Sequence, residues 1–338
     1  MAALGSGENP VIAVDAMGGD RAPAEIVAGA VAAAEQLDVD ILLVGPPAVL
    51  AEHLPGGVAP TRVTIEPASE VIAMDEEPAN AVRTKKASSI VVCANAVRDG
   101  RAHAMVGAGN TGATMAAALL RTGRIPGVQR PAIAVPVPVP GSAQMGLLLD
   151  AGATTDPEPE WLVQWAHLGR AFAAARFGID EPTVGLLSNG EEAGKGDELR
   201  KAASSLLANV KGFAGNVEGR DLLGGTVDVF LTDGFTGNVT LKTLEGALMG
   251  LAGLVFSVVD EPEWAAVADA LKLRLLEAAA PLLPDNTGGA VLLGIKGVCV
   301  ISHGSSSATA IVNAVRVARD SVQGDVIGRL TEAVASAG

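Results

Sequence analysis

Short apolar runs alternate with longer helical patterns along most of this chain, and this alternation is its most constraining feature. Most of the runs are apolar throughout rather than at every second residue, which is typical of strands covered on both faces. The pattern predicts an α/β fold with a doubly wound, mainly parallel sheet and helices on both sides. The strand candidates are 11–15, 41–45, 63–66, 102–107, 132–137, 146–150, 183–188, 227–232 and 298–302. The helix candidates lie near 23–36, 79–98, 113–121, 158–177, 192–208, 238–258, 263–280 and 307–318.

One strand candidate carries an unusual density of proline. The run PVPVP spans residues 136–140, and proline has no N–H to donate to a neighbouring strand. We therefore expect an edge strand or an extended crossover here. With 49% apolar and 18% charged residues, the 338-residue chain can bury a large core, and we treat 1–338 as one domain.

Charge and cysteine usage narrow the function classes. A net charge of −14 argues against nucleic-acid binding. Cys93 and Cys299 lie in apolar contexts without metal-ligand spacing, so we expect buried thiols in a reducing cytoplasm and no metal site. The first ten residues lack a basic segment followed by an apolar core, and no uninterrupted apolar run reaches about 18 residues, so we expect neither a signal peptide nor a transmembrane helix.

The glycine-rich stretch VGAGNTGAT (106–114) follows an apolar run and precedes a helical pattern. Its G-x-G-x-x-G spacing is typical of a phosphate-binding turn, because glycines let the backbone approach an anion and the helix N-terminus offers free N–H groups. The same spacing fits a dinucleotide fingerprint, but no acidic residue ends the next apolar run, and arginines occupy the intervening segment. A purely structural turn is the third interpretation.

Four further polar turns follow strand candidates. Together with 107–112, the turns at 15–20, 188–196, 232–238 and 302–307 would build one polar site if all lay at the same end of the sheet.

Within these turns, several side chains are candidates for chemistry. Asp15 closes an apolar run, Lys195 lies between two glycines, and His303 precedes a run of serines at a predicted helix start. Arg83 and Lys86 are three residues apart and would share one helix face. The lysines and the arginine are suited to bind phosphate, whereas His303 is suited to act as an acid or a hydrogen-bond donor.

Taken together and in order, these motifs resemble the PlsX family of acyl-carrier-protein-dependent phosphate acyltransferases. The matching stretches are DAMGGDRAP (15–23), AVRTKKASS (81–89), GAGNTGATMAA (107–117), GEEAGKGDE (190–198), NVEGRD (216–221), DGFTGNVTLKTLEG (233–246) and HGSSS (303–307). The chain departs from the family pattern at Thr154, at 188–192 and at 287–294, which leaves the reaction class intact and bears only on the preferred acyl chain.

The resemblance implies a three-layer fold similar to isocitrate and isopropylmalate dehydrogenases, and a homodimer. It implies transfer of a long acyl chain from acyl carrier protein to inorganic phosphate, giving acyl phosphate for phospholipid synthesis, with no cofactor. On the matching motifs we expect catalytic residues at Lys195, Asp233 and His303. The expected phosphate- and substrate-binding residues are Asp15, Gly18, Gly19, Arg83, Lys86, Ser88, Asn110, Thr111, Gly112, Asn189, Glu192, Gly234, Asn238, Gly304 and Ser305.

Three alternatives remain at this stage. A phosphotransacetylase acting on a short acyl-CoA would share the chemistry and differ in the donor. A nicotinamide-dependent dehydrogenase is supported by the glycine spacing, and a non-catalytic binding module would yield no acyl product.

A protruding helical hairpin is expected at 245–285. Two apolar stretches, 247–259 and 271–284, flank the acidic turn 260–264. We expect dimerisation through this hairpin. A weak peripheral membrane contact is the alternative, which the acidic turn disfavours on an anionic lipid surface.

Overall fold

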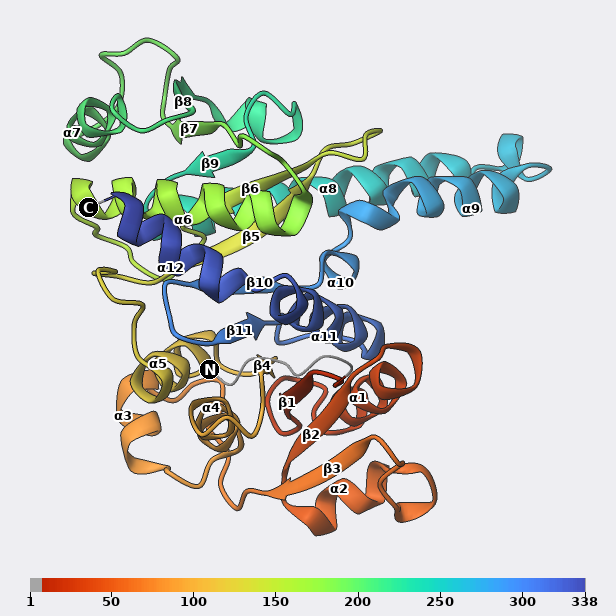
Figure 1. Cartoon of the computed structure of the whole chain (residues 1–338). Helices are drawn as coiled ribbons and strands as arrows, with labels where there is room; N and C mark the ends of the chain where they lie inside the picture. The colour runs from red at the N-terminus through yellow and green to blue at the C-terminus, as the bar shows by residue number, and fades with distance from the viewer. Residues whose placement is uncertain (1–7, 338) are drawn as a thin grey trace.

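The computed structural model describes residues 8–337, and eleven strands within them form one sheet (Figure 1). The strand order is β3-β2-β1-β4-β11-β10-β5-β6-β9-β7-β8, and all neighbouring pairs are parallel except β11–β10, β10–β5 and β5–β6. The mainly parallel sheet predicted from the apolar runs is confirmed. The strands are β1 (Val11–Asp15), β2 (Asp40–Gly45), β3 (Val63–Pro67), β4 (Ala104–Gly107), β5 (Ala132–Pro138), β6 (Met145–Leu149), β7 (Val184–Leu187), β8 (Phe213–Val217), β9 (Val229–Leu231), β10 (Ala290–Leu293) and β11 (Val298–Ile301).

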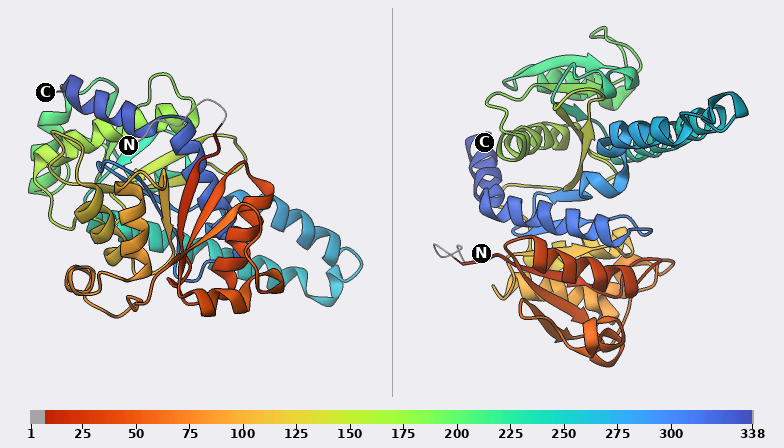
Figure 2. Two further views of the ribbon diagram at one scale, coloured as in Figure 1. Left: turned by 60° about the horizontal axis from the view of Figure 1, so that its bottom comes forward. Right: turned by 90° about the vertical axis from the view of Figure 1, so that its right-hand side faces the viewer.

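Helices cover both faces of the sheet, as expected for a three-layer fold (Figures 1 and 2). One face packs against α1 (Ala24–Gln36), α6 (Pro159–Phe177), α7 (Glu198–Leu207), α11 (Ala308–Gln323) and α12 (Val326–Ala337). The other face packs against α3 (Pro78–Thr84), α4 (Ser89–Arg98) and α5 (Thr111–Thr122). The short helix α2 (Pro47–His53) and the 3₁₀ turns η1 (Pro55–Gly57) and η2 (Gly219–Leu223) complete the body.

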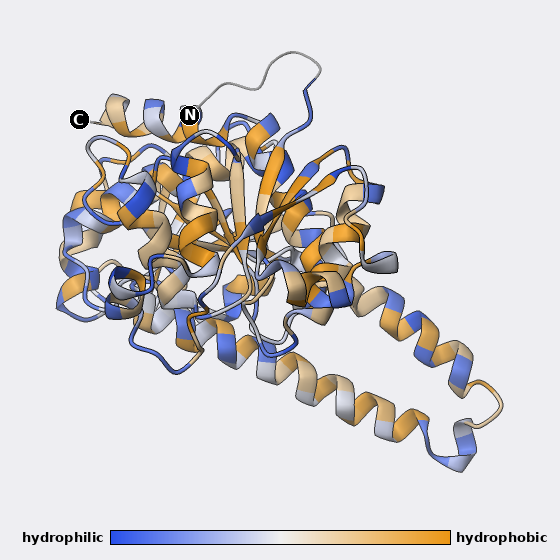
Figure 3. Cartoon of the chain, turned by 90° about the horizontal axis from the view of Figure 1, so that it is seen from below, coloured by the Kyte–Doolittle hydropathy of each residue, from blue (hydrophilic) through white to orange (hydrophobic). Residues whose placement is uncertain are grey.

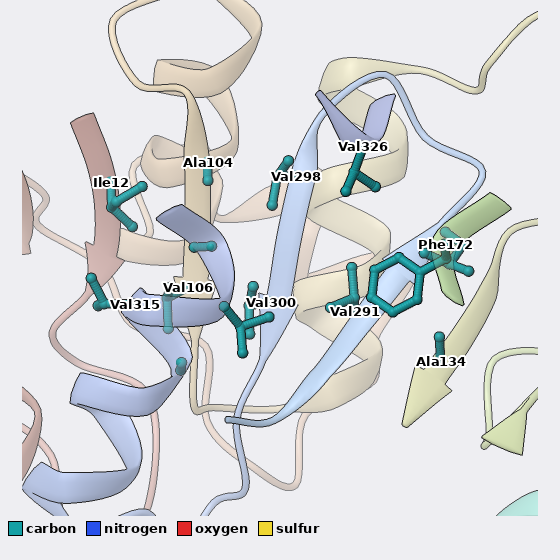
Figure 4. Close-up of a cluster of buried hydrophobic side chains, with 14 of the residues drawn as sticks. Ile12, Ala104, Val106, Ala134, Phe172, Val291, Val298, Val300, Val315 and Val326 are labelled. Atoms are coloured by element: carbon teal, nitrogen blue, oxygen red, sulfur yellow. The ribbon is translucent and has the colours of Figure 1, made fainter. Parts of the chain in front are cut away.

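A single row of paired residues crosses the sheet and anchors its core. Each member is buried in the same apolar cluster, and each buried Val or Leu contributes roughly 1.5–3 kcal/mol. Figure 4 shows four of them beside Phe172 of α6 and Val315 of α11. The row reads Val14, Val106, Val300, Val291, Ala134, Leu149 and Leu231.

The two halves of the sheet run in opposite directions toward this row. Strands β1, β4 and β11 end one residue beyond it, whereas β6 and β9 reach it from the other side and end on it. The reversal arises because three successive antiparallel pairs, β11–β10, β10–β5 and β5–β6, lie between the two halves. The expectation that all five polar turns lie at one end of the sheet is therefore wrong. The turns after β7 and β9 leave the row in the direction opposite to those after β1, β4 and β11.

The proline-rich strand β5 lies in the middle of the sheet, which corrects the expectation of an edge strand or crossover. Its partner β10 pairs only with Ala132–Ala134, so the segment from Val135 onward is paired on one side alone, with β6. Pro136 and Pro138 thus lie where β5 is locally an edge, and their missing N–H groups remove no bond to β10.

Two other local expectations are corrected. The helix expected near 79–98 is two helices, because α3 ends at Thr84 and the chain turns before α4 begins at Ser89. Ser88 stabilises that turn by donating from Oγ to the carbonyl of Lys85 at 2.8 Å. Strands β8 and β10 were not anticipated. The N-terminal residues used to exclude a signal peptide include 1–7, which lie outside the described residues.

The predicted helical hairpin protrudes from the body (Figures 1 and 2). It consists of α8 (Gly234–Val259), η3 (Pro262–Trp264) and α9 (Ala268–Ala279), and η4 (Ala280–Leu282) and α10 (Pro284–Thr287) return the chain to the sheet. Hydrophobic residues recur along both of its helices, among hydrophilic ones (Figure 3). By length and composition alone, α8 is long and apolar enough to cross a membrane. Only 6% of its most apolar window is buried within the protein. Counting uninterrupted apolar residues missed it, because Lys242 and Glu245 interrupt the run.

Candidate active site

The turns after β1, β4 and β11 pack directly on one another. A side chain at Gly18 would lie 2.8 Å from the backbone nitrogen of Gly109, and one at Gly19 would lie 3.0 Å from the carbonyl oxygen of Gly304. The backbone N–H of Asp20 donates to that same carbonyl at 2.8 Å. Glycine is therefore required for these three turns to approach so closely. Together they form one backbone-lined wall.

Asp15 lies behind this wall rather than at its surface. The side chain is buried, and its Oδ1 accepts the backbone N–H of Met17 at 3.1 Å. Burial raises the pKa of Asp15, and hydrogen bonds from Ser89, Met17 and Gly18 only partly oppose this. The carboxylate holds the turn in shape, and a direct contact with substrate would require displacing its buried partners.

The glycine turn leads into α5 through an asparagine cap. Oδ1 of Asn110 accepts the N–H of Ala113 at 3.0 Å, and its Nδ2 donates to the carbonyls of Met74 and Glu76. Because these contacts occupy its side chain, Asn110 positions the helix start rather than binding substrate directly. Thr111 and Gly112, the first two residues of α5, lie at a helix N-terminus suited to negative charge.

His303 stands at the end of β11, with both ring nitrogens near polar groups. Nδ1 lies 2.8 Å from the hydroxyl of Ser305, and Nε2 lies 3.2 Å from Nζ of Lys242 on α8. Lys242 also pairs with Glu245 at 2.8 Å. Below the histidine, the buried hydroxyls of Ser302 and Ser306 are 2.7 Å apart. The structure thus brings a histidine and a lysine together from distant parts of the chain.

The start of α8 is locked against the turn after β6. A side chain at Gly237 would lie 1.9 Å from the carbonyl oxygen of Asp150, and one at Gly234 would lie 2.7 Å from its Oδ2. The buried carboxylate of Asp150 accepts four backbone N–H groups, from Ile133, Gly152, Ala153 and Thr154. This close packing fixes where Asn238 and Lys242, one and two turns into α8, project.

These elements enclose a central cavity of about 320 Å³ between the two halves of the sheet. Asp20, Glu245 and Asp285 bring negative charge to it, and Lys242 brings positive charge. Four of the expected site residues line it, namely Thr111, Asn238, His303 and Gly304. Val135, Leu241, Glu245 and Thr287 line both this cavity and an apolar groove beside it. The groove runs along the locally unpaired half of β5, between Pro136, Pro138 and the apolar residues Leu223, Leu244 and Leu248.

The loop after β7 lies beside a different cavity, of about 380 Å³. Asn189 lines it and accepts the N–H of Gly196 at 2.9 Å. Lys195 and Glu192 are exposed on the same loop, and the Lys195 chain lies over Gly190. The expected catalytic residue Lys195 is therefore outside the lining of the central cavity.

Asp233, the third expected catalytic residue, is the N-cap of α8. Its Oδ1 accepts the N–H of Thr236 at 2.8 Å, and its Oδ2 pairs with the buried guanidinium of Arg200. Burial alone would raise the pKa of Asp233, but the hydrogen bonds from Thr236 and Arg200 outweigh it and hold the pKa below its usual value. Arg200 also bonds Asp197 and Thr232. This network indicates that Asp233 stabilises the start of α8 rather than taking part in catalysis.

Three further expected residues, Arg83, Lys86 and Ser88, do not line the central cavity. Arg83 and Lys86 are exposed, and because α3 ends at Thr84 they do not share a helix face as expected. The Ser88 hydroxyl is buried and bonded to a backbone carbonyl, so it is closed to substrate.

Two residues of this region were missed from sequence. Lys242 lies one turn after Asn238, an i, i+4 pair that would have placed both on one face of α8. Arg200 carried no comparable signal, since an arginine in an amphipathic helix is usually solvent-exposed. Among the described residues no cluster of His, Cys, Asp or Glu has the arrangement of a metal site. Cys93 and Cys299 are buried and unpaired, as expected, and burial raises the pKa of Cys299 to about 12.

Comparisons with known proteins agree with this architecture. A family model described as a fatty acid synthesis protein matches residues 11–329. A phosphate acyltransferase from Desulfitobacterium hafniense is 49% identical over 323 residues, which cover 94% of this chain and 95% of the relative. A second, from Nostoc sp., is 44% identical over 327 residues and covers 94% of each chain. The chain belongs to the PlsX family of phosphate acyltransferases. It is therefore an enzyme, a transferase of fatty acid synthesis.

Solved structures show the fold of this phosphate acyltransferase independently. A phosphotransacetylase from Streptococcus pyogenes superimposes with a TM-score of 0.60 at 17% identity, covering 94% of this chain and 95% of that one. A 4-hydroxythreonine-4-phosphate dehydrogenase from Klebsiella pneumoniae gives a TM-score of 0.50 at 12% identity, covering 92% and 98%. The isocitrate dehydrogenase-like fold expected from the family resemblance is confirmed. At these identities the likeness concerns the fold alone.

Proposed function

We propose that this phosphate acyltransferase moves a long-chain acyl group from acyl carrier protein to inorganic phosphate, releasing acyl phosphate for phospholipid synthesis. The observation that carries the proposal is the junction of two environments. The central cavity offers a lysine, a histidine and a helix N-terminus, and four of its lining residues also line the apolar groove. A phosphate suits the first environment, and an acyl chain suits the second.

In this proposal phosphate lies between Lys242, His303 and the N-terminus of α5 at Thr111. One phosphate oxygen attacks the thioester carbonyl carbon, and the resulting oxyanion is stabilised by nearby N–H groups. The carbon–sulfur bond then breaks, the carrier leaves as its thiolate, and the thiolate takes up a proton from water or from His303. Orientation supplies most of the acceleration, because phosphate is a weak nucleophile that must be held beside the carbonyl.

Turnover of palmitoyl carrier protein with phosphate tests this function. The acyl phosphate product is trapped with hydroxylamine as acyl hydroxamate, and acetyl-CoA is offered in parallel as the donor of a phosphotransacetylase. Hydroxamate from the palmitoyl donor and much less from acetyl-CoA is the expected result. Equal or better use of acetyl-CoA would establish the phosphotransacetylase alternative, and no product from either donor would reject both.

The hairpin is proposed to form the dimer interface of a cytoplasmic enzyme. Its exposed apolar side chains support this, since Met249, Leu251 and Leu254 of α8 are 72%, 58% and 62% exposed within one chain, and contiguous exposed apolar surface marks an interaction site. The second, weaker proposal is peripheral membrane contact through the hairpin tip at Trp264.

One pair of variants separates the two roles of the hairpin. Leu254→Glu is expected to convert a dimer to a monomer on a sizing column, because it buries a charge in the interface. Trp264→Glu at the tip is expected to leave the dimer intact. Strong co-sedimentation of wild type with phosphatidylglycerol vesicles, lost in Trp264→Glu with the dimer unchanged, would reverse this order of roles.

A further inference from the structure

A third cavity of about 260 Å³ lies on the other side of the α5 start from the central cavity. Residues of both halves of the sheet line it, including Met115 and Leu119 of α5, Pro131 before β5, Thr154 after β6 and Leu292 of β10. Most of this lining is apolar. None of the residues expected from sequence to bind substrate, apart from Gly112, borders it.

Only a thin wall separates this third cavity from the central one. Thr111 lines the central cavity and its neighbour Gly112 lines the third. In the turn after β6, Ala151 lines the central cavity, whereas Ala153 lines the third. At these two places, residues only one or two positions apart therefore line the two different cavities. A ligand in the third cavity would have its inner end beside the N-terminus of α5.

One face of α5 lines the third cavity along about two helical turns. Gly112, Met115, Ala116 and Leu119 line it at the i, i+3, i+4, i+7 spacing of one helix face. At 1.5 Å of rise per residue, this stripe extends about 10 Å along α5, away from the central cavity. We call the space the α5 channel.

An arginine stands at the outer part of the α5 channel. The Arg130 guanidinium lies 5.1 Å from the ring centre of Trp161, and no described carboxylate forms an ion pair with it. Its backbone carbonyl accepts the indole N–H of Trp165 at 3.0 Å, and the side chain of Gln164 bonds the N–H of Gln129. Arg130 is thus presented from a segment tied to α6. Ala79 of α3 also lines the channel. Arg83 lies one helical turn further along α3 and is exposed.

We propose that the α5 channel binds the phosphopantetheine arm of the acyl carrier, with its thioester at the inner end and its phosphate at Arg130. This inference rests on the function proposed above. An arm of this kind has a phosphate at one end and a thioester at the other, joined by an extended chain of methylenes and amides. A mainly apolar channel lined by a guanidinium and by the N-terminus of a helix offers partners for each of these groups. From the inner end of the channel, the acyl group would extend past the N-terminus of α5 toward the apolar groove, which shares four lining residues with the central cavity.

Two variants test the α5 channel at its two ends. Arg130→Gln removes the charge at the mouth, and Ala116→Phe fills the middle. The matched controls are Lys211→Gln, an exposed cation of the other half, and Leu120→Phe, an exposed neighbour on α5 that does not line the channel. Each variant is assayed with palmitoyl carrier protein and with palmitoyl N-acetylcysteamine, a thioester that lacks the phosphate end of the arm. Binding of holo- and apo-carrier is measured in parallel.

Arg130→Gln is expected to raise KM for the palmitoyl carrier about tenfold while leaving KM for phosphate and turnover of the short thioester unchanged. Ala116→Phe is expected to abolish the preference for holo- over apo-carrier in binding. Unchanged carrier kinetics in both variants, with wild type active, would overturn the channel but not the function. Equal losses with both donors would also overturn it. A wild type that makes no acyl phosphate from either donor would reject the function itself, whereas the binding preference would still report on the channel.

Discussion

The two sets of polar turns that converge on the central row of the sheet look alike in sequence but differ in construction. The turns after β1, β4 and β11 touch one another backbone to backbone, and a side chain at Gly18 or Gly19 would collide with them. The loop after β7 is open, and a side chain at Gly194 would meet nothing within 4 Å. Its neighbourhood is held instead by the ion network of Arg200.

This difference teaches that glycine-rich motifs report two separate physical needs. In the first set, glycine permits close approach and so builds a rigid wall with outward N–H groups. In the loop after β7, it leaves a segment that side chains must organise. The turn after β9 resembles the first set in this respect, because a side chain at Gly237 would collide with the carbonyl oxygen of Asp150. Rigid placement of groups around a developing charge is what catalysis needs. We therefore expect losses of stability from the Arg200 network beside the loop after β7, and losses of turnover from the central cavity that the wall lines.

The largest effect is expected from Arg200→Leu. Removing this buried guanidinium leaves the carboxylate of Asp233 without its ionic partner, which costs about 3–5 kcal/mol of unfolding free energy. Denaturant unfolding at pH 7 measures it, and Arg98→Leu, an exposed pair with Asp99, is the control. A loss no greater than in the control would show that the network does not organise the second set.

The same variant carries a pH signature. In the wild type, the lowered pKa of Asp233 stabilises the fold above the ordinary value of 3.8, and this stabilisation is lost as pH falls through the lower folded value. Without Arg200, burial would raise the pKa of Asp233. Protonation of this carboxylate at low pH would then reduce the destabilisation of the variant. The stability gap between the two proteins should therefore narrow from pH 6 to pH 3. A constant gap would contradict this assignment.

The next effect concerns Lys242→Ala in the wall-lined cavity. Loss of this cation should lower kcat/KM for phosphate about 100-fold, or about 2.7 kcal/mol at the transition state, with an unchanged melting temperature. Lys272→Ala, on the exposed hairpin, is the control. Activity equal to the control would remove Lys242 from the site.

The Lys195→Ala variant tests the loop after β7 in the same comparison. The sequence predicts a loss of at least tenfold in turnover, about 1.4 kcal/mol, whereas the exposed position of Lys195 outside the central cavity leads us to expect a smaller loss than for Lys242→Ala. Steady-state kinetics of both variants in one assay give the order. A larger loss for Lys195→Ala would shift the reaction toward the second set of turns.

The smallest effect is expected from Cys93→Ala with Cys299→Ala. Burial raises the pKa of both thiols, to about 12 for Cys299, so neither is a thiolate at neutral pH and neither serves as a nucleophile. The double variant should keep its rate constants. Mass spectrometry of wild type quenched during turnover provides a second readout, and an acyl-cysteine adduct would contradict direct attack by phosphate.

Sequence reasoning reached the α/β class and the sheet because apolar periodicity records burial directly, and it reached the hairpin because two apolar stretches flank an acidic turn. It missed the reversal of strand direction, since nothing in a run of apolar residues states its direction, and it missed β10, a short run among glycines. It named His303, Thr111, Asn238 and Gly304 near the cavity because motifs mark them. It could not pair Lys242 with His303, since the contact joins residues 61 positions apart.

The prolines of β5 also bear on how this protein avoids self-association. An unpaired strand segment with free N–H groups invites a strand from another molecule to add to the sheet, which leads to aggregation. Pro136 and Pro138 offer no N–H along the segment that β10 leaves bare. This segment of β5 therefore cannot pair with a strand from another molecule. The groove beside it remains accessible to a ligand.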